Sequence, residues 1–96
     1  MGLAVEAAHA RDAADPLIDR FSVAAANGQC IENVTYLMIR EHGPQHAATI
    51  VRASLVVLSR HGEQQRALGC AGDIAAQAIA AGADPDGVLK ATAAGL

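Results

Sequence analysis

Histidine and cysteine are the metal-binding side chains to consider first, and the chain has four histidines and two cysteines. His42 and His46 are four residues apart, but a Gly-Pro pair between them argues against a shared helix. A zinc site needs three or four ligands with ordered spacing, and Cys30 and Cys70 each lack a CxxC companion. His42 and His61 each precede a glycine, which is typical of the last turn of a helix. We therefore expect no metal site and no cofactor.

The two cysteines are expected to be free thiols. Cys30 and Cys70 lie among small and apolar residues, and the first residues lack the basic and then apolar run of an export signal. We therefore expect a cytoplasmic protein, in which thiols stay reduced. The most apolar run, 47–58, is interrupted by Arg52 and is too short for a membrane helix of about 20 residues.

Side chains that could act as nucleophiles have no predicted partners. Ser22, Ser54 and Ser59 lie within helical patterns and not at a strand-to-helix turn. Glu6 and His9 supply half of a di-iron carboxylate-histidine pair, and no second pair follows. We expect a protein that is not an enzyme. A metal or thiol enzyme using His42, His46, His61 and the two cysteines is the weakest alternative.

Length and charge restrict the function further. With 96 residues the chain is expected to form a single domain, 1–96. Its net charge is −3, its predicted pI is about 5.7, and its seven basic residues are scattered. Proteins that bind nucleic-acid phosphates usually cluster Lys and Arg, and Phe21 and Tyr36 alone cannot form a platform for base stacking. Nucleic acid is therefore not a favoured partner.

Helix-capping residues divide the chain into short helices. Asp-Pro pairs begin helices at 15 and 84, and glycines close them. Residues 34–39 also have a strand-like composition, but the Gly-Pro step after His42 favours a helix there. We predict an all-α protein, a compact bundle of five to six short helices around a central apolar helix at about 44–61. The expected helices are 3–14, 15–26, 29–42, 44–61, 63–81 and 85–94.

The central helix, 44–61, is apolar around most of its circumference. A helix of this kind is either buried at the centre of its fold or shared with a partner. Arg52 interrupts the apolar run, and we expect its charged group to reach water rather than to be buried and paired. The interaction face expected on this helix consists of Val51, Arg52, Leu55, Val56, Val57 and Arg60.

Residues 73–92 resemble a helix-turn-helix. Ala78 occupies the position of tight helix contact, Gly82 lies in the turn, and Val88 is placed to pack back onto the first helix. The second helix begins with acidic residues and has Lys90 as its only cation, which is unfavourable beside DNA phosphates. The same small residue, glycine and apolar return also suit a plain helical hairpin.

These observations favour a non-catalytic helical interaction module: a regulator, an inhibitor or an assembly subunit. Its expected partners are further copies of the chain, in a homodimer or higher oligomer, and/or a larger protein. No membrane is expected as a partner. The alternative is a helix-turn-helix DNA-binding regulator that uses residues 73–92.

Overall fold

The computed structural model describes residues 15–95, and within them the chain is helical with no strand. The expected helix at 3–14 lies outside the described residues. Residues 34–39 fall inside α3, so the preference for a helix there is confirmed, as is the all-α fold. The elements are α2 (Asp15–Ala26), α3 (Ile31–His42), the 3-10 turn η1 (Pro44–His46), α4 (Ala47–Ala67), α5 (Ile74–Ala80) and α6 (Pro85–Gly95).

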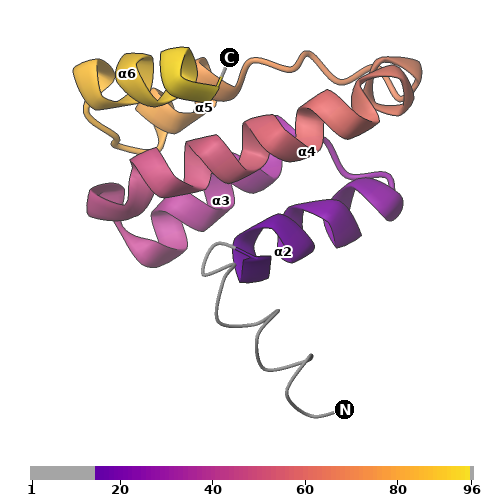
Figure 1. Ribbon diagram of the computed structural model, residues 1–96, viewed down its shortest axis with the longest axis horizontal. Coiled ribbons are helices and arrows are strands. Elements are labelled where there is room, and N and C mark those ends of the chain that lie inside the picture. Colours follow the sequence, from indigo (N-terminus) through magenta and orange to yellow (C-terminus); the bar gives the residue numbers. More distant parts are fainter. Residues whose placement is uncertain (1–14, 96) are drawn as a thin grey trace, which may run out of the picture.

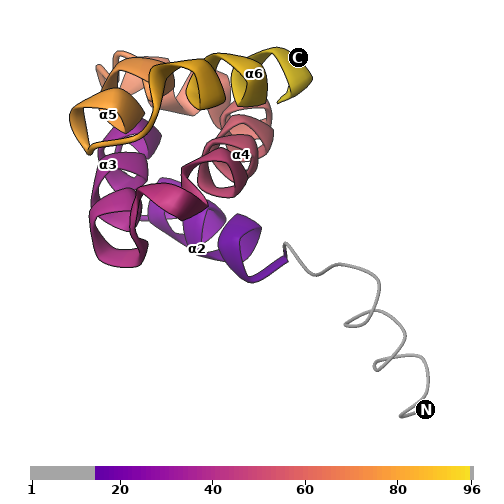
Figure 2. The same ribbon diagram turned by 90° about the vertical axis from the view of Figure 1, so that its left-hand side faces the viewer.

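Helix α4 lies at the centre of the bundle, as its apolar composition predicts. It packs against α2, α3, α5 and α6, and in Figures 1 and 2 it lies between α2 and α6. Small side chains allow the helices to approach closely, and larger apolar side chains fill the space between them. The largest apolar side chains of this core are Phe21, Ile31, Met38, Ile39, Ile50, Val51, Val57 and Val88.

Glycines with positive φ end two of the helices where the sequence predicts. Gly28, at φ 81°, follows α2, and Gly43, at φ 100°, follows α3. The Gly43 N–H donates to the carbonyl of Ile39 at 2.8 Å and so closes the last turn of α3. Pro44 then begins η1 without needing a backbone donor, and this turn leads directly into α4.

The boundary expected between a helix at 44–61 and another at 63–81 is wrong. His61 has non-helical angles, φ −119° and ψ 17°, but α4 continues through this kink to Ala67. Residues 68–73 form a loop instead of a helix, and α5 starts only at Ile74. Gly69 and Gly72 adopt φ of 82° and 74° in this loop, conformations that a continuous helix does not contain.

Candidate functional site

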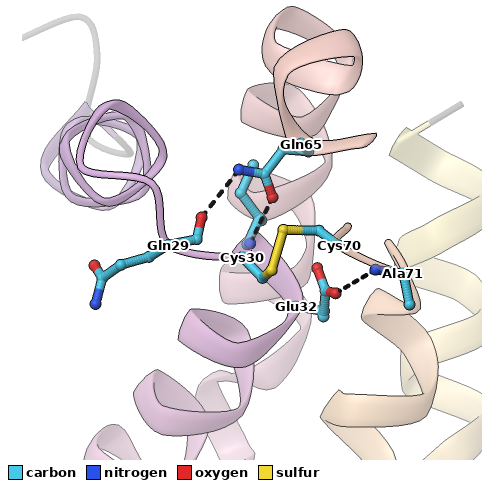
Figure 3. Close-up of a disulfide and its surroundings, with 7 residues drawn as sticks. Gln29, Cys30, Glu32, Gln65, Cys70 and Ala71 are labelled. Carbon is cyan, nitrogen blue, oxygen red and sulfur yellow. Dashed lines mark hydrogen bonds between the residues drawn. A yellow bond between two sulfur atoms is a disulfide. The ribbon is translucent and has the colours of Figure 1, made fainter. Parts of the chain in front are cut away.

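The loop between α4 and α5 is joined to the start of α3 by a disulfide. Cys30 and Cys70 are bonded across a sequence separation of 40, with their Cα atoms 5.4 Å apart. The expectation of free thiols is therefore wrong. A disulfide is uncommon in the reducing compartment that the sequence predicts. The bond also accounts for the loop at 68–73 that interrupts the helix expected over 63–81, because Cys70 leaves the path of α4 to reach Cys30 (Figure 3).

A buried glutamine fixes the backbone on either side of Cys30. Gln65, from the last turn of α4, is almost completely buried. Its Oε1 accepts the N–H of Ile31 at 2.9 Å, and its Nε2 donates to the carbonyl of Gln29 at 2.9 Å (Figure 3). One side chain thus satisfies a donor and an acceptor of the turn that leads into α3. Cys30 is therefore positioned independently of its bond to Cys70.

Glu32 is a buried carboxylate beside the disulfide. Only 4% of the residue is exposed, and its Oε2 accepts the N–H of Ala71 at 2.8 Å. Its Oε1 is buried and has no hydrogen-bond partner. None of the ion pairs among residues 15–95 includes Glu32. An unpaired oxygen of this kind is uncommon in protein interiors, where almost every buried polar atom has a partner.

A cavity of about 370 Å³ adjoins this cluster. Cys70, Ala71 and Gly72 form its wall on the loop side, and α4 supplies the opposite wall with Leu55 and Gln65. Cys70 itself is half-buried, so the disulfide has access to solvent through this opening. The site combines a disulfide, a buried carboxylate and an adjoining cavity.

A second feature is a groove between α2 and α3. Val23 and Leu37 are 60% and 59% exposed, and both line a cavity of about 240 Å³. Arg20 lies at one end of this groove, where it forms an exposed ion pair with Glu41 at 2.7 Å. Asn27 lies at the other end, beside the turn between the two helices. Exposed ion pairs add little stability. The Arg20–Glu41 pair matters here because it makes one end of the groove charged.

The six residues of the expected interaction face do not form one surface. Val51 and Val57 are fully buried in the core, and Leu55 and Val56 are half-buried. Arg52 and Arg60 are exposed, so the expectation that Arg52 reaches water is confirmed. The buried part of this expected face thus belongs to the core, where α4 packs against α2, α3, α5 and α6.

The histidines stay apart from the cysteines. Within residues 15–95, Cys30, Glu32 and Cys70 are the one group of three side chains close enough to share a metal ion. His42 and His46 line a small cavity at the start of α4, and His61 contacts Gln64 at 3.2 Å. The weakest alternative, an enzyme using His42, His46 and His61 with the cysteines, therefore lacks the expected cluster among the described residues.

The segment that resembles a helix-turn-helix folds as a short helical hairpin. Ala78 and Val88 are buried, and Gly82 lies in the turn with φ 108°. Asp84 caps α6, because its Oδ2 accepts the N–H of Gly87 at 2.9 Å. Lys90 is exposed. The acidic start of α6 thus has a structural role that does not involve DNA.

Comparison with known proteins adds no further guide to function. No protein-family model, no characterised protein and no solved structure matches the chain. Across the described residues, every helix is too short or too polar to cross a lipid bilayer.

Proposed function

We propose that this protein is a non-catalytic helical interaction module that self-associates through the groove between α2 and α3. The observation that carries the proposal is the pair Val23 and Leu37, two large apolar side chains that are mostly exposed and line one groove. Neighbouring exposed apolar residues with a polar border are typical of protein–protein contact surfaces. These residues support a contact surface on α2 and α3 rather than on the 44–61 helix that the sequence favours.

The order of residues along the groove supports a second copy of the chain as the partner. The ion pair between Arg20, in the middle of α2, and Glu41, in the last turn of α3, places charged groups at one end of the groove. The groove is thus charged at the Arg20–Glu41 end, apolar in the middle and amide-bearing at the end with Asn27 and Gln29. In Figure 3 the side chain of Gln29 points away from the disulfide cluster, which leaves its amide free for a partner.

A two-fold axis through the apolar middle would match these ends. It would place Val23 and Leu37 of one copy against the same residues of the other. The charged end of each copy would then face the amide end of its partner. Amides both donate and accept hydrogen bonds, so Asn27 can serve Glu41 with its N–H groups and Arg20 with its oxygen. The surface is therefore complementary to itself when rotated by 180°.

The proposal predicts that Leu37→Lys abolishes dimerisation. A lysine in the apolar middle of a two-fold contact would face its own copy, so two like charges would be desolvated together. The matched control is Leu89→Lys, because Leu89 is 60% exposed, lies within α6 and is outside the groove. Light scattering after size exclusion should give a dimer for the wild type and for Leu89→Lys, and a 9.8-kDa monomer for Leu37→Lys.

Circular dichroism shows whether each variant keeps its helices. Both leucines are exposed, so both variants should fold as the wild type does. A wild-type protein that stays monomeric at millimolar concentration would refute self-association. A Leu37→Lys protein that remains dimeric would refute the assignment of the interface to α2 and α3.

The helix-turn-helix alternative has weaker support from the same structure. The helix that would enter the major groove begins with Pro85 and Asp86, both exposed, and Asp84 before them is committed to capping. Carboxylates there would face DNA phosphates at close range. The residues available for a protein contact are apolar and exposed, whereas those available for DNA are mainly acidic.

A further inference from the structure

We propose that reduction of the Cys30–Cys70 disulfide creates a binding site for a thiophilic divalent cation of the zinc class. The ligands are Sγ of Cys30, Sγ of Cys70 and a carboxylate oxygen of Glu32. In the oxidised structure these ligand atoms already lie within 4.8 Å of one another. Two thiolates and one carboxylate are ligands that zinc accepts, with the fourth position open to water. This inference is independent of the proposed self-association.

The unpaired oxygen of Glu32 is the observation that points to a cation. The carboxylate is nine-tenths buried, and its Oε2 is occupied by the N–H of Ala71. Its Oε1 is buried without a partner, and no cationic side chain among the described residues pairs with it. A bound cation would supply the partner that this oxygen lacks. Figure 3 shows the carboxylate beside the disulfide, and a carboxylate oxygen lies within 4.8 Å of both sulfur atoms, which become metal ligands once they are separated.

Opening of the disulfide needs a dithiol reductant, and binding of the cation then releases protons. Thiolate attack on the disulfide breaks the sulfur–sulfur bond, and two electrons pass from the dithiol to the protein. The dithiol is oxidised to its own disulfide, and Cys30 and Cys70 become thiols. A bound divalent cation then displaces one proton from each thiol, and both protons pass to solvent.

The local structure allows the two sulfurs to separate by the required amount. Zinc–sulfur bonds of about 2.3 Å in a tetrahedral site place two sulfurs roughly 3.8 Å apart. Cys70 lies in the loop between α4 and α5, between Gly69 and Gly72, which have no side chains to hinder a change of backbone angles. Cys30 directly precedes α3.

The other side of the site stays fixed when the disulfide opens. Gln65 holds the backbone before and after Cys30 through its bonds to Gln29 and Ile31. Glu32 belongs to the first turn of α3, so it moves with Cys30 as one unit. The cavity of about 370 Å³ beside Cys70 gives the cation and the reductant a route from solvent. Two of the three ligands are thus positioned before the cation arrives.

The test compares cobalt and zinc binding by oxidised and reduced protein. The disulfide is reduced with a water-soluble phosphine, which is oxidised to its oxide and is then removed under anaerobic conditions. Reduced wild-type protein should bind one Co²⁺ per chain with thiolate-to-cobalt charge-transfer absorption, and one equivalent of Zn²⁺ should abolish that absorption. The oxidised protein should show neither, because its sulfurs are bonded to each other.

The variant Glu32→Gln tests the carboxylate, and Glu63→Gln is its control at an exposed position of α4. Loss of an outer-shell partner of a metal ligand costs about 10- to 100-fold in affinity, so loss of the ligand itself should weaken Zn²⁺ binding at least tenfold. Glu63→Gln should bind as the wild type does. Equal affinity of Glu32→Gln and wild type would overturn the proposal, because the metal would then be held by the cysteines alone.

Circular dichroism shows whether the protein loses helical structure when its disulfide is reduced. If reduction lowers helicity, one equivalent of Zn²⁺ should restore it in the wild type, because a cation that binds the native state stabilises that state. Helicity that is lost on reduction and not restored by Zn²⁺ would refute a site built on the native fold. The absence of stoichiometric Co²⁺ binding to reduced wild type would refute it equally.

Discussion

Val57→Asp should unfold the protein or lower its free energy of unfolding by about 4 kcal/mol or more. Val57 is fully buried in the middle of α4, the helix against which all the others pack. An aspartate at this position would lose the apolar contacts of the valine and would place a carboxylate in the core without a partner. Thermal unfolding followed by circular dichroism measures the loss.

The neighbouring substitution Val56→Asp is the matched control. Val56 is half-buried, so the carboxylate of an aspartate at this position would reach solvent. The cost should be about 1 kcal/mol or less, within the range of surface substitutions. Two adjacent valines changed to the same residue should therefore differ by several kcal/mol. If the two variants melt at the same temperature, the rotation of α4 about its axis is not the one described above.

Replacing both cysteines with serine should lower the free energy of unfolding by about 4 kcal/mol. The disulfide spans a sequence separation of 40, and a chain-entropy model gives about this stabilisation for a loop of that length. Denaturant unfolding of the wild type and of the Cys30→Ser, Cys70→Ser double variant measures the difference.

A reductant provides the control for the disulfide within one protein. It should shift the unfolding midpoint of the wild type toward that of the double variant, and it should leave the double variant unchanged. A wild-type midpoint that is the same with and without reductant would show that Cys30 and Cys70 are free thiols. That result would also remove the starting point of the metal-site proposal.

Most of the helix boundaries follow from local chemistry, and for that reason the sequence predicts them. The Asp-Pro steps at 15 and 84 and the Gly-Pro step at 43 act through backbone angles and missing donors in a few residues. Such signals do not depend on the rest of the fold. The central position of α4 is likewise indicated by its own apolar circumference.

The loop at 68–73 could not be predicted in the same way, because distant contacts determine it. The spacing of Ala67, Leu68 and Ala71 continues the helical period of the residues after Ile74. In the structure, Cys70 is bonded to Cys30, and the Ala71 N–H donates to Glu32 across a separation of 39. Tertiary constraints of this kind override local helix propensity. Small residues such as alanine also give a weak periodic signal, because they occur in core and surface alike.

One feature of the candidate site is visible in the sequence, namely the position of Glu32 within its helix. Helical spacing places Glu32 on the same face of α3 as Thr35 and Ile39, both of which are buried. A glutamate on a buried face indicates a polar site or a bound cation. The pairing of Cys30 with Cys70 was available from their number alone, since two cysteines allow one disulfide. The expected cytoplasmic compartment favours free thiols instead of this disulfide, because thiols stay reduced there.

The α2–α3 groove arises from packing, and sequence periodicity does not distinguish it from core. Val23 and Leu37 have the residue types and helical setting of buried positions, yet the fold leaves both side chains mostly exposed. Which apolar face stays uncovered depends on the order and direction of all the helices. That information comes only with the assembled fold.

An isotope-filtered nuclear Overhauser experiment on a mixture of labelled and unlabelled chains tests the central claim, self-association through α2 and α3, most directly. It detects only contacts between different copies. Self-association through α2 and α3 predicts intermolecular signals from the methyl groups of Val23 and Leu37. It predicts none from those of Leu89, which is equally exposed on α6. Intermolecular signals confined to Leu89, or none at all at millimolar concentration, would contradict it.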